Sequence, residues 1–103
     1  MTRRRGKLHL PSKTPLFPLG KVVATPGALA LLEEHGRNAA EFLLRHERGD
    51  WGDVGDQDKR ANEDGLRHGA RLLSVYPIAD QSRLWIITEA DRSSTCLLLP
   101  EEY

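Results

Sequence analysis

Apolar and polar positions in the last third of the chain follow a pattern that predicts β-structure. Three short apolar runs, over residues 71–78, 83–89 and 95–99, are separated by polar turns. Runs of this length, with turn residues between them, are typical of consecutive antiparallel strands. The middle run is apolar at successive positions around Trp85. This continuity places it at the centre of the sheet, with Trp85 packed between neighbours on two dry faces.

The middle of the chain carries helical signals instead. Thr25-Pro26 supplies a hydroxyl N-cap and a proline at the first helical position, and Gly36 suits the left-handed residue that follows a helix. Asn38 opens a second helix, with Glu41 three residues later in a capping-box relation. Two short helices are therefore predicted, and they should pack as a hairpin.

A third, more polar helix is predicted over residues 56–68, with Asp56 as its N-cap. Val22 and Val23 indicate a short strand over residues 20–24, ahead of the helices. The order is therefore a short strand, two or three helices and then three strands. It predicts an α+β fold, in which the three strands form a three-stranded antiparallel meander with helices packed on one face.

Length and charge divide the chain in two. A chain of 103 residues, 39% hydrophobic and 29% charged, suits one globular domain. Residues 1–32 hold six basic side chains and no acidic one, whereas residues 33–103 hold nine basic and fifteen acidic ones. We therefore expect a basic, proline-containing and largely irregular arm over residues 1–19, and a single α+β domain over residues 20–103.

Compartment and chemistry are bounded mainly by what the sequence lacks. No apolar run approaches the roughly 20 residues that cross a bilayer, and the basic amino terminus is not followed by an apolar signal region, so we expect a cytoplasmic protein that binds no membrane. Zinc-protease, paired-cysteine, serine-hydrolase and phosphate-loop motifs are missing. The sequence therefore predicts no cofactor and no metal site, and favours a protein without enzymatic activity over an enzyme.

The single cysteine and the histidines fit structural roles. Cys96 lies in a strand-like run, where a buried and inert thiol is expected. His35, His46 and His68 lie near the carboxyl ends of the predicted helices, where a positive charge is favourable.

Turn residues supply the candidate binding surface. The loop over residues 49–58 sets Trp51 among glycines and aspartates, where a large ring either anchors the loop to the core or binds a partner. At the second hairpin, Arg92 is expected to pair with a carboxylate across the turn. The candidate surface for a protein partner consists of Trp51, Asp53, Glu89, Asp91 and Arg92.

The chain also resembles a known family. The run LWIITEADRSSTCLLLPEEY, together with GDWGDVGDQDKRAN and LLSVY, is similar to a family of small uncharacterised bacterial proteins. These are often encoded on plasmids, integrative elements and prophages, and carry labels such as "plasmid-related protein" or restriction–modification subunit. The resemblance covers roughly residues 20–103. It implies an accessory or regulatory protein of a mobile genetic element, whose protein partner and oligomeric state stay open.

Two other functions remain open. The order of a strand, two helices and three strands is similar to that of RelE-like toxins, which implies an endoribonuclease with Arg71, Arg83, Arg92 and Glu89 as candidate residues. The third hypothesis is DNA binding through the amino-terminal arm. Clustered cations are what phosphate binding requires, and the arm supplies them at Arg3, Arg4, Arg5 and Lys7.

Overall fold

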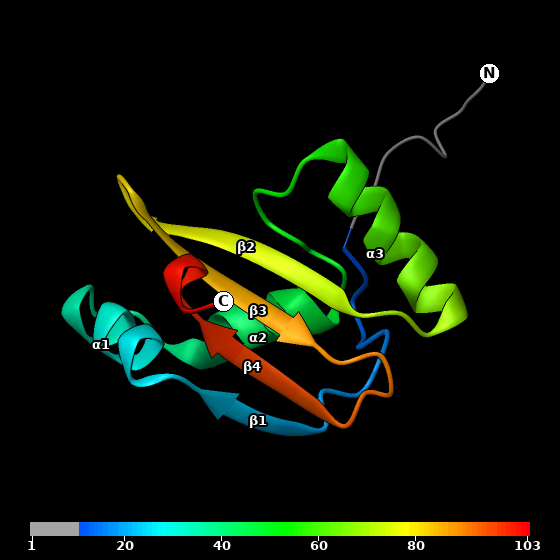
Figure 1. The fold of residues 1–103 in the computed structure, drawn as a ribbon, viewed down its shortest axis with the longest axis horizontal. Helices are drawn as coiled ribbons and strands as arrows, with labels where there is room; N and C mark the ends of the chain where they lie inside the picture. Colours follow the sequence, from blue (N-terminus) through cyan, green and yellow to red (C-terminus); the bar gives the residue numbers. More distant parts are fainter. Residues whose placement is uncertain (1–10) are drawn as a thin grey trace.

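The computed structural model describes residues 11–103, which form a four-stranded sheet with three α-helices (Figure 1). The strands are β1 (Lys21–Ala24), β2 (Leu72–Ala79), β3 (Ser82–Thr88) and β4 (Ser94–Leu98), and the helices are α1 (Pro26–Glu34), α2 (Ala39–Glu47) and α3 (Asp56–His68). A short 3₁₀ helix, η2 (Pro100–Glu102), follows β4. The α+β class is as predicted. Of the basic residues of the amino-terminal arm, Arg3, Arg4, Arg5 and Lys7 lie outside the described part of the chain, whereas Lys13 lies within it.

The sheet is mixed, which corrects the prediction of a three-stranded antiparallel meander. The strand order is β1-β4-β3-β2, and the pairs β2–β3 and β3–β4 are antiparallel. The fourth strand, β1, runs parallel to β4, with the Lys21 amide donating to the Ser93 carbonyl and the Thr25 amide donating to the Leu97 carbonyl. No local turn joins β1 to β4, so a strand of four residues gave no pairing signal in the sequence.

The helices begin near the expected residues, but two of the expected caps differ. Thr25 accepts a hydrogen bond from the Ala28 amide, and Asn38 accepts one from the Ala40 amide, as N-caps do. Glu41 pairs with Arg37 at 3.0 Å, where a capping box was expected. The N-cap of α3 is Gly55, and its predicted cap, Asp56, is the first helical residue. An acid in the first turn still complements the helix dipole.

The core lies between the sheet and the helical hairpin on one face. Side chains from both layers are buried there: Ala28, Leu32, Phe42, Tyr76, Leu84, Ile86 and Leu97. Figure 1 shows α2 crossing behind the strands, whereas α3 lies beside the β2 edge. The Asn62 amide of α3 bonds both to the Leu73 carbonyl (2.7 Å) and to the Leu73 N–H (3.0 Å). A side chain thus takes the place of a neighbouring strand on β2.

A loop segment closes the rest of the β2 edge. The Val75 amide donates to the Trp51 carbonyl (2.9 Å), and the Asp53 amide donates to the Val75 carbonyl (2.6 Å). Gly52, between them, has φ of 75°, and a Cβ placed on it would lie 2.1 Å from the Val75 oxygen. The loop therefore reaches β2 only with glycine at this position.

The opposite face of the sheet has no helix of the hairpin over it. Trp85 projects there from β3, which is a central strand as predicted, but its side chain is half-buried rather than enclosed on two dry faces. The ring of Tyr103, which follows η2, packs on Trp85 with 5.5 Å between ring centroids. The end of the chain therefore folds back onto the sheet.

Candidate functional site

Trp51 anchors its loop to the core. The side chain is 2% exposed, and its ring stacks on Phe17 at 6.3 Å and meets His46 edge-on at 5.8 Å. Phe17 itself belongs to the irregular segment before β1 and is buried. Of the two roles open to this tryptophan, the anchor is the one that the packing supports.

A cavity of about 230 Å³ lies beside this loop, lined by Pro11, Asp50, Trp51, Gly52, Val54, Asp56 and Lys59. The indole N–H of Trp51 is buried and has no hydrogen-bond acceptor within the described residues. Asp50, one of the lining acids, already binds Arg45 at 2.7 Å and accepts from the Gly52 amide, so its carboxylate is largely committed.

Next to the anchor lies a buried chain of polar groups. His46 is fully buried, with Nδ1 2.6 Å from the Ser74 hydroxyl and Nε2 2.9 Å from the Thr88 hydroxyl. The Thr88 hydroxyl lies 2.7 Å from that of Thr95, which donates to the Leu19 carbonyl. This network of hydrogen bonds joins α2 to β2, β3, β4 and the segment before β1.

The proton positions in this hydrogen-bond network follow from its last acceptor, the Leu19 carbonyl. Because Thr95 donates to a carbonyl, its oxygen accepts from Thr88, and the Thr88 oxygen accepts in turn from Nε2–H of His46. Nδ1 is then the acceptor of the Ser74 hydroxyl. His46 is therefore the neutral Nε2–H tautomer. Burial, with a smaller contribution from Arg92, lowers its pKa from 6.5 to about 3.

This neutrality corrects the expectation of a positive charge at the end of the helix. The apolar helical spacing of Phe42 and His46 was the available signal that His46 faces the core. Its hydroxyl partners lie far away in sequence, which is why the network could not be predicted.

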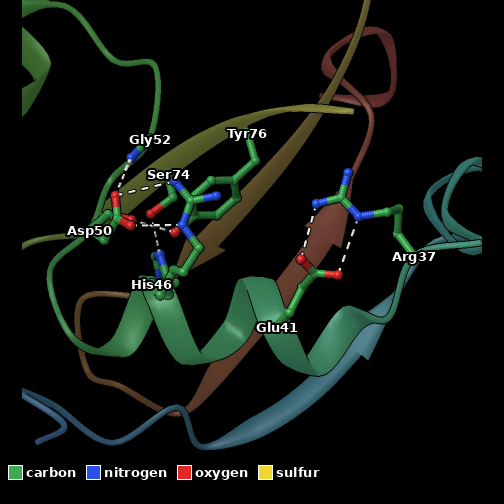
Figure 2. Close-up of polar contacts among 8 residues, drawn as sticks. Arg37, Glu41, His46, Asp50, Gly52, Ser74 and Tyr76 are labelled. Carbon is green, nitrogen blue, oxygen red and sulfur yellow. Dashed lines mark hydrogen bonds and ion pairs between the residues drawn. The ribbon is translucent and has the colours of Figure 1, made fainter. Parts of the chain in front are cut away.

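Figure 2 shows a second group of contacts around Asp50, beside His46 and Ser74. The Tyr76 hydroxyl donates to the Asp50 carbonyl (2.5 Å), and the Arg45 guanidinium lies over the Tyr76 ring at 4.5 Å. Burial raises the pKa of Tyr76 well above its ordinary value. These contacts fasten the loop to α2 and β2, and leave the Tyr76 hydroxyl protonated at neutral pH.

Arg92 is a structural residue of the β3–β4 turn. Its guanidinium donates to the main-chain carbonyls of Gly65, Ala70, Glu89 and Ala90, at 2.7–3.2 Å. The expected pairing with a carboxylate is therefore wrong. The residue has φ of 61°, a left-handed conformation that is unfavourable for a side chain with a Cβ, and its bonds tie the turn to the end of α3.

Arg92→Ala is expected to lower the free energy of unfolding by about 2 kcal/mol, because four carbonyls lose a charged donor. Urea unfolding followed by circular dichroism measures the change. The control Arg60→Ala, at an exposed position of α3, is expected to stay within about 0.5 kcal/mol of the wild type. Equal losses in the two variants would contradict the role given to the turn.

The remaining candidate residues are exposed. Asp53 lies 3.7 Å from Arg83 in an exposed ion pair. Asp91 accepts from the Ser93 amide, the local turn bond that its residue type favours. The Ser93 hydroxyl, followed by this amide, lowers the pKa of the Asp91 carboxyl. Glu89 is exposed at the end of β3. The structure thus buries Trp51, commits the Arg92 guanidinium to carbonyls and leaves the three acids accessible.

A different group of side chains gathers on the face of the sheet opposite the helical hairpin. Tyr103 is 63% exposed and packs on the Trp85 ring, and the Arg71 guanidinium lies over the Tyr103 ring, 5.3 Å from its centroid. Arg83 lies two residues from Trp85 on the same strand and therefore projects from the same face. We call Arg71, Arg83, Trp85 and Tyr103 the aromatic face. Tyr103 could not be identified from the sequence as part of this surface, because its position depends on the path of the carboxyl-terminal tail.

Cys96 is half-buried, not buried as predicted. Desolvation, followed by the nearby Glu102 and Glu89, raises the pKa of its thiol. The thiol is therefore protonated at neutral pH and lacks the thiolate character of an activated nucleophile.

Within residues 11–103, no group of three His, Cys, Asp or Glu side chains is arranged to hold a metal ion. The helices of this part of the chain also include none with the length and apolar character to cross a membrane. Comparisons with protein-family models, with curated proteins and with solved structures gave no match for this chain.

Proposed function

We propose that this chain is an accessory or regulatory protein of a mobile genetic element, which acts by binding a protein partner through the aromatic face. The observation that carries the proposal is the exposed Tyr103 ring, in contact with Trp85 and Arg71 on the face of the sheet that the helical hairpin leaves open. Trp, Tyr and Arg are the residue types that most often dominate the energy of protein–protein interfaces.

The tail that presents Tyr103 is held in place before any partner arrives. The Glu102 carboxylate accepts from the Thr25 hydroxyl (2.6 Å) and from the Leu99 amide (2.7 Å). These bonds lower the pKa of Glu102, so the carboxylate stays ionised at neutral pH. A ring held by such contacts loses little conformational entropy on binding, which favours its use as a recognition residue.

The charges around the rings indicate the chemistry of the partner. Arg71 and Arg83 border the aromatic pair, and the counter-ion of Arg83 among residues 11–103 is the exposed Asp53. An exposed pair of this kind contributes little, so Arg83 is free to exchange its partner at small cost. We therefore propose a partner segment that carries carboxylates next to apolar or aromatic side chains.

The test is capture from a bacterial host that carries the element, followed by binding measurements with the purified captured protein. Tyr103→Ala and Arg83→Ala are each expected to weaken its binding by tenfold or more, since they remove contacts typical of binding hot spots. Leu44→Ala is the matched control, because Leu44 is 44% exposed on the opposite layer. No specific capture by the wild type, or equal binding by Tyr103→Ala, would contradict the proposal.

The second candidate function is RNA cleavage of the RelE-like kind. It is favoured by the combination of exposed arginine and aromatic side chains on an open sheet, which also suits stacking and phosphate contacts with single-stranded RNA. Here Arg71 and Arg83 are the residues in question, since Arg92 is bound to carbonyls. Induced expression should then arrest growth, and Arg71→Ala with Arg83→Ala should relieve the arrest. Normal growth with intact cellular RNA would remove this candidate.

A further inference from the structure

The two edges of the sheet differ in whether they are closed. The β2 edge is covered by the segment 51–53 and by Asn62. On the other edge, β1 pairs only with β4 among the described strands, and Val22 and Val23 are 43% and 41% exposed. Figure 1 shows β1 along the margin of the molecule, with no described element beyond it. An uncovered edge strand is a template for pairing with another strand.

The backbone groups available on β1 follow from its pairing with β4. The amides of Lys21 and Thr25 point at β4. Because successive residues of a strand point their N–H and C=O groups to opposite sides, those of Val22 and Ala24 point outward. When β1 pairs with the β1 strand of a second copy in antiparallel orientation, Val22 lies opposite Ala24 of the second copy. By symmetry, Ala24 lies opposite Val22 of the second copy. Both pairs then exchange two hydrogen bonds.

This register also matches charges. Val23 of each copy lies on the twofold axis, and Lys21 lies opposite Thr25 of the second copy. The Thr25 hydroxyl donates a hydrogen bond to the Glu102 carboxylate, so a negative charge lies beside Thr25. Residues 11–32, which include Lys21, contain no acidic side chain. Lys21, Val23 and Thr25 share one face by strand alternation, so ammonium and carboxylate meet on the same side of the joined sheet.

We propose that the chain forms a weak, symmetric dimer through β1, in which Val23 pairs with Val23 of the second copy and Lys21 pairs with Glu102 across the axis. The two sheets become one continuous sheet, and the aromatic faces of both copies lie on the same side of it. The association is weak because a four-residue strand buries less than the roughly 1,200 Å² of a stable interface. The dimer does not rest on the proposed function: it uses the β1 edge and none of the four side chains of the aromatic face, and Glu102 is the residue that the two proposals share.

Analytical ultracentrifugation over protein concentrations from the micromolar to the millimolar range tests the association. The wild type is expected to dimerise, with an association constant that falls several-fold as salt screens the Lys21–Glu102 pairs. Val23→Lys sets like charges on the axis, and Val22→Pro removes an outward N–H without touching the β4 pairing. Both are expected to lower the association constant tenfold or more, whereas Leu44→Lys, the matched control, leaves it unchanged. A monomeric wild type at millimolar concentration would overturn the proposal.

Oxidative crosslinking tests the register. Opposed residues of a non-hydrogen-bonded antiparallel pair have Cα atoms about 4.5 Å apart, within the range that a disulfide spans. With Cys96 replaced by serine, Val23→Cys is therefore expected to form a disulfide-linked dimer rapidly. Leu44→Cys, equally exposed on the opposite layer, is expected to stay monomeric. Equal crosslinking of the two cysteine variants would place the interface elsewhere and overturn the proposal. Dimers that persist in Val23→Lys and Val22→Pro would do the same.

Discussion

His46→Leu is expected to lower the free energy of unfolding at pH 7 by about 3 kcal/mol, although the new side chain is apolar and similar in volume. The imidazole bonds the hydroxyls of Ser74 and Thr88, and all three groups are fully buried. Leucine leaves both hydroxyls without this partner in a dry site, where each unmade bond costs about 1–3 kcal/mol. Urea unfolding measures the loss. The control His35→Leu replaces an exposed histidine and should change little, and equal losses would refute the network.

The same histidine sets an acid limit on stability. Its pKa is about 3 in the folded chain, against 6.5 as its ordinary value, so the unfolded chain binds the proton first as pH falls. The contribution of neutral His46 is fully present above about pH 6.5 and is lost progressively between that pH and about 3. A series of unfolding curves over this range should show a loss of several kcal/mol, and His46→Leu should flatten the part above pH 5. A wild-type profile that is flat between pH 5 and 6.5 would contradict the assignment.

Gly52→Ala is expected to be at least as damaging, with a loss of about 3 kcal/mol or more. A Cβ at this position meets the Val75 carbonyl at 2.1 Å, and φ of 75° is itself unfavourable for alanine. The loop must move off the β2 edge, which exposes Trp51. Urea unfolding gives the loss, and a red shift of tryptophan emission in the folded state reports the exposed indole.

Gly36→Ala is the matched control for this change. Gly36 has φ of 62°, but nothing lies within 4 Å of the Cβ it would gain. Alanine there carries only the backbone cost, about 1–2 kcal/mol. The difference between the two variants therefore measures the close approach of the loop to β2. Equal losses would show that the loop does not seal this edge.

The sequence allowed the helices to be predicted because their signals are local. Thr25-Pro26 and Asn38 act on amides within three residues of themselves, and the structure has the N-caps at these positions. The three strands after α3 were equally accessible, since short turns join them and set their antiparallel pairing.

What escaped prediction depends on contacts between distant residues. The parallel pairing of β1 with β4 spans most of the chain, and only the folded structure brings Leu19 to Thr95. The candidate surface was chosen from residue types in turns, which cannot distinguish an exposed group from a committed one. Arg92 illustrates this, because its partners are main-chain carbonyls, which every residue has and which residue types therefore cannot indicate.

The structure separates residues that hold the fold from residues that are available for binding. Trp51, His46 and Arg92 carry the most suggestive chemistry in the sequence, and each has internal partners. Tyr103 and Trp85, by contrast, meet on a face that no helix of the hairpin covers. The two proposals use what is left accessible, the aromatic face and the β1 edge.

The most direct test of the central proposal is hydroxyl-radical footprinting of the chain, free and with its captured partner, read out by mass spectrometry. We predict that oxidation of Tyr103 and Trp85 falls several-fold on binding, while oxidation of Leu44 on the opposite layer is unchanged and the enclosed Trp51 reacts slowly in both states. Protection of Leu44, with Tyr103 and Trp85 as reactive as in the free chain, would contradict the proposal and place the partner on the helices.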